Sequence, residues 1–264
     1  MRVRTALAAA TAFVALATTP ASAITYGVAD RDGHPSVGAL IGKFGDKFFQ
    51  VCSGTLIAPD VFLTASHCTS YLEEQNALAY VTFDSTLSPG STLIGGTMHT
   101  NPAFFLPGVG NTADVAVVTL DPSADVLDIC ECASAHLPTA GLLEGLGAKG
   151  GLKNQKFTSV GYGATERVKT GPGAPVNGDT NLRMVAAGTF DALSGNWLRI
   201  SQNPATGNGG TCYGDSGGPN FLGASDVIAG LTVSGDRWCR STNVTFRLDT
   251  PAARDFLKDW VALP

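Results

Sequence analysis

The sequence predicts an all-β protein that ends in one helix. Only 15% of its 264 residues are charged, and 32 are glycine. Short runs rich in Val, Thr and Leu alternate with turns of Gly, Pro and Asn, which is the pattern of strands joined by tight turns. The chain contains no repeat and no low-complexity linker. Together these observations favour an all-β domain.

The segment that follows Asp249 breaks the strand pattern. Asp249 or Thr250 can cap a helix, and Pro251 suits its first turn. Four apolar side chains then recur on one face, spaced in pairs four residues apart: Phe256, Leu257, Trp260 and Val261. We therefore predict a C-terminal helix that docks through this face.

Residues 1–23 have the pattern of a secretory signal peptide. Arg2 and Arg4 give a positive start, residues 6–17 form an apolar core, and Ala-Ser-Ala at 21–23 forms a small-residue cleavage site. The apolar core is too short to span a bilayer comfortably. We expect a secreted protein.

The mature chain is predicted to be acidic. The full chain has a net charge of −5, and the signal peptide contributes two positive charges and no negative ones. A negative surface disfavours binding to nucleic acid and to anionic membranes. No later segment is long and uncharged enough to cross a membrane. We expect a monomer with neither nucleic acid nor membrane as a partner.

The most informative motif is Gly-Asp-Ser-Gly-Gly-Pro at residues 214–219. Small neighbours allow a substrate carbonyl to approach the Ser216 hydroxyl, and they leave backbone N–H groups free to face the oxygen that becomes negative. A glycine-rich run alone indicates only a turn. A nucleophilic serine also needs a base, usually histidine, and a carboxylate that orients it.

All four histidines precede Ser216. This order excludes the α/β-hydrolases, which place their histidine after the serine. His67 stands out because it follows an apolar strand and a small-residue turn in Leu-Thr-Ala-Ser-His-Cys at 63–68. We predict His67 as the base. The others are predicted to be solvated or structural residues: His34, His99 and His136.

The orienting carboxylate is predicted to be Asp114. It opens the run Asp-Val-Ala-Val-Val-Thr-Leu at 114–120. A continuous apolar run is typical of a fully buried strand, where a carboxylate can be shielded and aimed. The alternative is an acid that closes a turn after Asn111 and Thr112.

The order His67, Asp114, Ser216 and the three motifs around them resemble the chymotrypsin-like (trypsin-family) serine proteases. The likeness continues at residues 52–57, 160–163 and 230–239, so it spans essentially the whole mature chain. The resemblance implies two six-stranded antiparallel β-barrels, with the C-terminal helix docked on the second barrel.

The resemblance also implies that the two barrels carry different residues of the active site. Residues 24–137 would form the first barrel and carry the histidine and the aspartate. Residues 138–264 would form the second and carry the nucleophile and the specificity pocket. The implied activity is hydrolysis of polypeptides through an acyl-enzyme, with the backbone N–H groups of Gly214 and Ser216 as oxyanion hole. Proteinaceous inhibitors are further expected partners, and no cofactor is expected.

The specificity pocket is predicted by the same resemblance. Gly210 would form its floor, where trypsin carries an aspartate, Gly235 would keep one wall open, and Asn243 would line the back. Without a fixed negative charge, we predict that the pocket prefers apolar or small side chains. Val233 and Ser234 depart from the family's serine and tryptophan, which removes a hydrogen bond from the aspartate and an aromatic wall from the pocket.

The predicted mature N-terminus, Ile-Thr-Tyr-Gly at 24–27, resembles the Ile-Val-Gly-Gly start of the family. In that family the new ammonium group inserts beside the acid that precedes the nucleophile. We hypothesise that signal peptidase directly releases an active enzyme in which Ile24 pairs with Asp215. The alternative is that Ile24 begins a frayed terminus.

The chain has six cysteines, all outside the signal peptide. The resemblance implies two disulfides, Cys52–Cys68 around the histidine turn and Cys212–Cys239 beside the nucleophile. Cys130 and Cys132 can bond to each other, remain reduced or pair between chains. They find no further Cys or convergent His, so we expect no metal site.

Two other functions share this framework. A protein of this fold can be a binding module that has lost its catalytic groups, but all three triad residue types are present here. An esterase would use the same three residues, and the sequence does not separate it from a protease.

Overall fold

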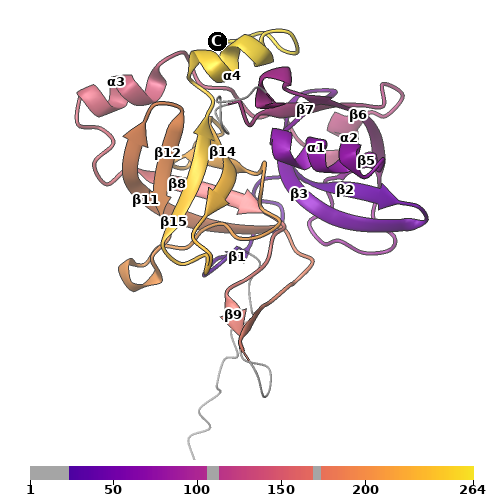
Figure 1. The fold of residues 1–264 in the computed structure, drawn as a ribbon, viewed down its shortest axis with the longest axis horizontal. Coiled ribbons are helices and arrows are strands. Elements are labelled where there is room, and N and C mark those ends of the chain that lie inside the picture. Colours follow the sequence, from indigo (N-terminus) through magenta and orange to yellow (C-terminus); the bar gives the residue numbers. More distant parts are fainter. Residues whose placement is uncertain (1–23, 106–112, 169–173) are drawn as a thin grey trace, which may run out of the picture.

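The computed structural model describes residues 24–105, 113–168 and 174–264. The predicted signal peptide lies outside this range. Two antiparallel β-barrels lie side by side, the first in indigo to magenta and the second in pink to yellow (Figure 1). The predicted fold class is confirmed.

The first barrel closes in the order β2-β3-β4-β7-β6-β5. Its strands are β2 (Val37–Phe44), β3 (Lys47–Ala58), β4 (Val61–Thr64), β5 (Leu78–Thr82), β6 (Ile94–Thr100) and β7 (Ala116–Leu120). Leu40, Leu56, Phe62 and Val118 are fully buried in its core. Gly54 is required in β3, because a Cβ there would overlap the Phe62 ring and the Leu63 carbonyl.

The second barrel closes in the order β8-β11-β12-β15-β14-β13, since β8 pairs with both β13 and β11. Its strands are β8 (Lys156–Gly161), β11 (Met184–Ser194), β12 (Trp197–Ser201), β13 (Pro219–Leu222), β14 (Ile228–Gly235) and β15 (Thr242–Arg247). The short strand β1 (Val28–Ala29) pairs with β11, and β9 (Arg167–Val168) pairs with β10 (Val176–Asn177). The N-terminal segment therefore crosses to the second barrel before the first barrel begins.

A buried arginine joins the barrels. Arg183, directly before β11 of the second barrel, is 2% exposed, and its Nε donates to Asp30 Oδ2 at 2.9 Å. Its Nη1 donates to the carbonyls of Val37 (3.1 Å) and Phe83 (2.9 Å). Each contact links the second barrel to the N-terminal segment or to the first barrel. A buried charge with this many partners fixes the angle at which the two barrels meet.

Three short helices were not expected from the sequence: α1 (Ser66–Glu74), α2 (Val126–Cys130) and α3 (Leu142–Ala148). Two 3₁₀ turns, η1 (Pro102–Phe105) and η2 (Pro204–Thr206), complete the helical structure of the described residues. In α1, Cys68 and Leu72 are buried four residues apart. Such a short amphipathic segment gives a weak periodic signal among strand-like runs, so it was missed.

The C-terminal helix α4 (Pro251–Leu257) is present but shorter than the predicted apolar face. Neither predicted cap acts through its side chain: Thr250 makes no capping bond, and the Asp249 carboxylate instead binds Arg247 at 2.9 Å. Trp260 lies beyond the helix, and its ring packs against His99 in β6 with centroids 4.2 Å apart. The C-terminal segment thus contacts the first barrel as well as the second.

Candidate active site

His67 is placed by a change from strand to helix. β4 ends at Thr64, Ala65 has extended backbone, and α1 begins at Ser66. The Ser66 hydroxyl donates to the Val115 carbonyl at 2.8 Å. This bond ties the histidine turn to the segment that carries Asp114.

Asp114 holds the His67 ring in one orientation. Asp114 Oδ2 lies 2.8 Å from His67 Nδ1, and Asp114 Oδ1 accepts a hydrogen bond from the His67 backbone N–H at 2.9 Å. The Asp114 side chain is 1% exposed and that of His67 33%. A buried carboxylate at Nδ1 favours the tautomer with its proton on that nitrogen, which leaves Nε2 free to accept a proton.

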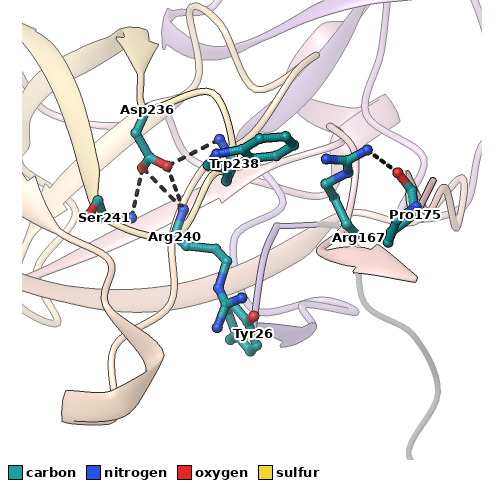
Figure 2. A pocket seen from close by; sticks show the side chains of 7 residues that line it. All are labelled: Tyr26, Arg167, Pro175, Asp236, Trp238, Arg240 and Ser241. Carbon is teal, nitrogen blue, oxygen red and sulfur yellow. Dashed lines mark hydrogen bonds between the residues drawn. The ribbon is translucent and has the colours of Figure 1, made fainter. Parts of the chain in front are cut away.

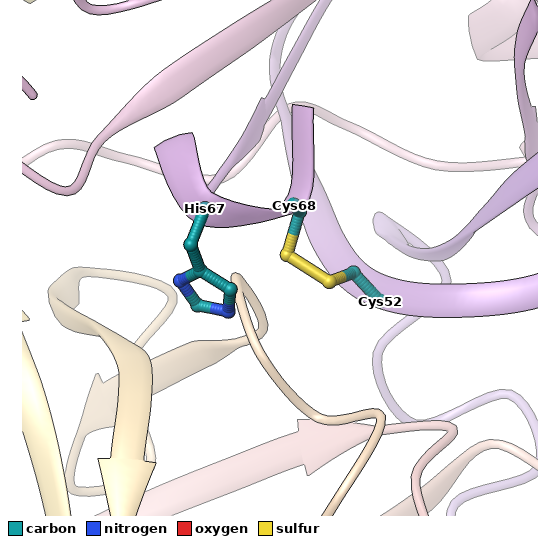
Figure 3. A group of neighbouring side chains, drawn as sticks. All are labelled: Cys52, His67 and Cys68. Carbon is teal, nitrogen blue, oxygen red and sulfur yellow. A yellow bond between two sulfur atoms is a disulfide. The ribbon is translucent and has the colours of Figure 1, made fainter. Parts of the chain in front are cut away.

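A disulfide supports the same turn. Cys68 follows His67 in α1 and bonds to Cys52 in β3, and Figure 3 shows the imidazole ring beside this disulfide. The three residues are the one group in the described chain whose donor atoms are close enough to share a metal ion. Because the two sulfurs are bonded to each other, they offer no thiolate to a metal.

Ser216 reaches the same place from the second barrel. Ser216 and His67 both line a cavity of about 250 Å³, although 148 residues separate them in the chain. The Ser216 carbonyl accepts from the Ser53 N–H at 2.8 Å, which anchors the loop that carries Ser216 to β3. No hydrogen bond joins the two side chains in the described structure, and such bonds often tighten only when substrate binds.

The other histidines have partners elsewhere. His34 pairs with Asp30 at 2.5 Å, and His136 pairs with Asp226 at 2.9 Å. His99 packs against Trp260, as described above. None of the three lines the cavity that holds Ser216.

Two side chains of the first barrel brace the predicted oxyanion loop. The Gly214 carbonyl accepts hydrogen bonds from Gln50 Nε2 at 2.9 Å and from Ser53 Oγ at 3.1 Å. Gly214 has φ +95°, a conformation that favours glycine. These contacts hold the peptide between Gly214 and Asp215 in one orientation. Neither contact could be predicted from the sequence, because the partner of both side chains lies more than 160 positions away.

Replacing Gln50 by methionine tests this brace. Methionine keeps most of the volume but cannot donate to the Gly214 carbonyl. A typical net hydrogen bond contributes about 1 kcal/mol, so we expect kcat to fall about five-fold with KM nearly unchanged. Steady-state kinetics measures the effect, with Gln75→Met at an exposed position as the matched control. An unchanged kcat would show that the brace is not needed.

Asp215 is an unpaired buried carboxylate. Its oxygens accept from the backbone N–H groups of Gly163 and Cys212, both at 2.8 Å. It has no cationic partner among the described residues. Burial raises its pKa from 3.8 to about 7, although the two backbone donors act in the opposite direction. The negative charge of Asp215 is therefore poorly compensated in the unprocessed chain.

The segment that starts at Ile24 is inserted into the second barrel. Ile24 is fully buried and packs against Met184 and Ala186. Thr25 N donates to the Gly210 carbonyl at 2.8 Å, and Gly210 N donates back at 3.0 Å. Residues 24 and 25 are therefore packed within the second barrel in the full chain. In the full chain the Ile24 nitrogen is still an amide, so it carries no charge.

The predicted pocket residues divide into two sets. Gly235 lines a cavity of about 240 Å³ that also contains Ser216, Thr211 and Val233. Gly210 and Asn243 do not line this cavity, and both are buried.

The space behind Gly210 is filled by a residue that sequence analysis missed. Gln202 is fully buried, and a Cβ added at Gly210 would overlap its side-chain amide. Asn243 is also held in place, because its Nδ2 donates to Asn220 Oδ1 at 2.8 Å. Gln202 therefore occupies the space next to Gly210, where the pocket floor was predicted. Gln202 had no recognisable signal, since it stands alone in a polar stretch after β12.

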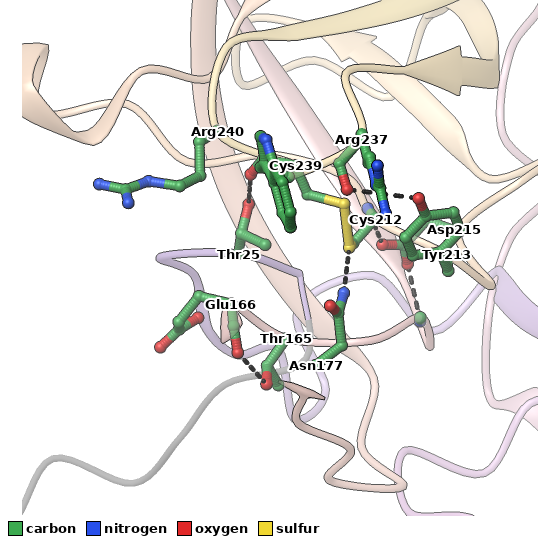
Figure 4. The surroundings of a disulfide bond; sticks show 12 residues. Thr25, Thr165, Glu166, Asn177, Cys212, Tyr213, Asp215, Arg237, Cys239 and Arg240 are labelled. Atoms are coloured by element: carbon green, nitrogen blue, oxygen red, sulfur yellow. Dashed lines mark hydrogen bonds between the residues drawn. A yellow bond between two sulfur atoms is a disulfide. The ribbon is translucent and has the colours of Figure 1, made fainter. Parts of the chain in front are cut away.

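All six cysteines are paired. The two disulfides implied by the resemblance form, and Cys130 bonds to Cys132, which answers the question left open by the sequence. Figure 4 shows the Cys212–Cys239 bridge, with the Thr25 hydroxyl donating to the Cys239 carbonyl at 2.8 Å. This bridge links the loop before Ser216 to the loop after β14, and the Thr25 contact adds the N-terminal segment. None of the helices among the described residues has the length and apolarity to cross a membrane.

Comparisons with known proteins agree with this geometry. A family model described as Trypsin matches residues 29–260. A solved structure described as HL collagenase is similar, with a TM-score of 0.63 and 18% sequence identity. That similarity covers 89% of this chain and 97% of the other, and at this identity it concerns the fold alone. A comparison with curated proteins finds no matching sequence.

Proposed function

We propose a function from one premise: the chain belongs to the trypsin family and is a serine-type endopeptidase. In this proposal it is a secreted enzyme, and its catalytic residues are His67, Asp114 and Ser216. The contact of 2.8 Å between His67 Nδ1 and Asp114 Oδ2, at the cavity that His67 shares with Ser216, supports this assignment most strongly. We further propose that its pocket accepts apolar or small side chains.

Each proposed catalytic residue has one role. As Ser216 Oγ attacks the scissile carbonyl carbon, its proton moves to His67 Nε2. Asp114 keeps the ring oriented and stabilises the imidazolium. When the tetrahedral intermediate collapses, the C–N bond breaks and His67 gives its proton to the leaving amine. Water then attacks the acyl ester by the same route and releases Ser216.

The negative oxygen of the tetrahedral intermediate would be bound by the backbone N–H groups of Gly214 and Ser216. Loss of one such donor lowers the rate about 100- to 1000-fold in comparable sites. The contacts of Gln50 and Ser53 with the Gly214 carbonyl support this role, since they hold the loop before substrate arrives. A preorganised site avoids reorientation of dipoles during the reaction.

The lining of the cavity beside Ser216 supports the preference for apolar or small side chains. Its one lining carboxylate, Asp236, is bound by four backbone N–H groups. Digestion of a peptide library, with products identified by mass spectrometry, tests activity and preference together. We expect cleavage after small or apolar residues, and none by the Ser216→Ala variant. Cleavage only after Lys or Arg would contradict the proposed preference.

We also propose that processing before Ile24 activates the enzyme. The new ammonium group would lie at the end of a buried segment and would pair with the Asp215 carboxylate. The burial of Ile24 and the lack of a cationic partner for Asp215 support this pairing. N-terminal sequencing of the secreted protein tests the start site, and a start well beyond Ile24 would exclude it.

The pH dependence of stability tests the Ile24–Asp215 pair. In the unprocessed chain Asp215 holds its proton up to about pH 7, whereas in the unfolded chain it loses it near 3.8. Between pH 3.8 and pH 7 the folded state therefore keeps a proton on Asp215 that the unfolded state has lost. The free energy of unfolding falls as pH rises through this range, by about 4 kcal/mol in total. Above pH 7 this loss is constant. An ammonium group paired with Asp215 would lower the pKa of that carboxyl in the folded state, and most of this loss of unfolding free energy would then disappear.

The comparison uses two Ser216→Ala chains that differ only at the start. One begins at Ser22, so that the Ile24 nitrogen remains an amide, and the other begins at Ile24. Urea unfolding between pH 4 and 8 should show the stability loss in the first chain and little of it in the second. Equal pH profiles would contradict the pairing.

Secretion is proposed from the signal-like residues 1–23 and from the three disulfides, which form in oxidising compartments. The substrates are polypeptides, as for the family. We propose that the enzyme acts as a monomer and that proteinaceous inhibitors bind at the same cavities.

A further inference from the structure

A cluster of arginines surrounds one tryptophan on the second barrel. The Arg167 guanidinium lies 4.4 Å from the centre of the Trp238 ring, and that of Arg237 lies 5.0 Å from it. The Arg240 guanidinium lies 5.8 Å from the Tyr26 ring. We call these five residues the arginine patch. Figure 2 shows four of them around a cavity of about 450 Å³.

The charges of the arginine patch are not neutralised. None of its three arginines forms an ion pair among the described residues. Arg167 donates instead to the Pro175 carbonyl, which holds it in place. Two carboxylates bind backbone N–H groups of the patch. That of Glu166 accepts from the Tyr26 N–H at 3.2 Å, and the other belongs to Asp236.

Asp236 also lines the patch cavity, but its carboxylate is occupied. It accepts from the backbone N–H groups of Trp238 (3.1 Å), Arg240 (3.1 Å), Ser241 (2.7 Å) and Thr242 (3.0 Å). Partial burial raises the pKa of Asp236, but these bonds outweigh it and hold the pKa below its ordinary value. Asp236 therefore shapes the arginine-bearing loop and leaves the guanidinium groups free for a ligand.

The arginine patch adjoins the cavity that contains Ser216. Asp236 lines both cavities, and Cys239, between Trp238 and Arg240, lines the one beside Ser216. Tyr213 also lines the cavity beside Ser216, and its hydroxyl donates to the Arg237 carbonyl at 3.3 Å. The loop of residues 236–240 thus separates the two cavities, and a polypeptide bound at Ser216 can contact the patch across this loop.

The chemistry of the patch selects an anionic ligand. Guanidinium groups bind carboxylates through paired hydrogen bonds, and stacking on an indole keeps such groups oriented. The full chain has a net charge of −5, so this positive patch is a local exception. From this geometry we propose that the arginine patch binds acidic side chains of the polypeptide substrate, outside the pocket beside Ser216. The proposal rests on the proposed function of that pocket.

The first test compares two peptides that share one cleaved sequence, with a flanking run of three Glu or three Gln residues. The run is placed in turn on each side of the cleaved bond. On one side we expect the Glu peptide to have a KM about ten-fold lower at low salt, with kcat unchanged. The advantage should shrink at high salt, because the patch is exposed.

The variant Arg237→Gln/Arg240→Gln should abolish the advantage of the Glu peptide. Both side chains are exposed, so the variant should fold normally, and Arg199→Gln is the control at an exposed position outside the patch. Equal KM for the Glu and Gln peptides, or an advantage that survives in the double variant, would overturn the proposal. So would binding of a sulfated polysaccharide to the patch without any effect of Glu in peptides.

A second measurement separates this proposal from the proposed catalytic residues. Equilibrium binding of the Glu and Gln peptides to the Ser216→Ala chain needs no turnover. Tighter binding of the Glu peptide that disappears in the double variant supports the patch, even if the wild-type chain is inactive. Equal binding of the two peptides overturns the patch, even if the wild-type chain cleaves both.

Discussion

Replacing Ser216 by alanine is expected to lower kcat/KM for peptide hydrolysis by about 10⁶-fold without unfolding the protein. In the proposed mechanism the Ser216 hydroxyl forms the acyl bond, and alanine has no group that replaces it. The backbone contacts of the loop do not involve this side chain: the Ser53 N–H still binds the carbonyl at position 216. The measurement is steady-state hydrolysis of the best library peptide, together with the urea unfolding midpoint.

Ser225→Ala is the matched control, because Ser225 is an exposed serine that bonds only within its own loop. It should retain full activity. If the Ser216→Ala variant kept more than about a tenth of wild-type activity, Ser216 would not be the nucleophile. The expected magnitude is taken from another serine protease, in which single loss of the nucleophile has this effect.

Replacing Asp114 by asparagine is expected to lower kcat about 10⁴-fold, the size of this effect in a related Ser-His-Asp site. The asparagine amide would donate toward His67 Nδ1, where the carboxylate now accepts at 2.8 Å. The ring would then carry its proton on Nε2 and could not accept one from Ser216. The asparagine oxygen can still accept from the His67 backbone N–H, so the turn should keep its structure.

Val233 stands where the family has a serine that donates a hydrogen bond to the aspartate. Asp114 therefore lacks this donor, and its substitution mainly tests its contact with His67. Among the described residues, both hydrogen bonds that Asp114 accepts come from His67. Asp255→Asn, at an exposed position, is the control. A loss smaller than ten-fold in the Asp114→Asn variant would show that the carboxylate does not set the tautomer of His67.

The residues that we propose to carry the chemistry could be predicted from the sequence, because each lies in a short motif with its own local structure. Ser216 stands between small residues, His67 follows a strand and a tight turn, and Asp114 opens a buried strand. These local patterns are independent of the rest of the chain. The spatial meeting of His67 and Ser216 could be predicted only through the family resemblance.

The supporting contacts could not be predicted, because they join residues far apart in the sequence. Gln50 reaches Gly214 across the boundary between the barrels, and Gln202 fills the space behind Gly210. Arg183 binds Asp30 over a separation of 153 residues. No local sequence pattern indicates these contacts, so only the packed structure shows them.

The C-terminal helix shows a further limit of sequence analysis. The apolar face from Phe256 to Val261 was found, but the helix ends at Leu257, before its last two members. The Trp260 ring packs against the His99 ring of the first barrel. Beyond Leu257 the chain continues as a turn, in which the N–H groups of Trp260 and Val261 donate to the Leu257 carbonyl at 3.0 and 3.1 Å, so helical hydrogen bonding fades over these residues.

Reaction of the processed chain with a sulfonyl fluoride, followed by peptide mapping, tests most directly whether His67 and Ser216 act together. We predict a single adduct on Ser216, stoichiometric with loss of peptidase activity, and no adduct in the His67→Ala variant. Modification of a different residue, or labelling of Ser216 at an unchanged rate without His67, would contradict the proposed pairing of base and nucleophile.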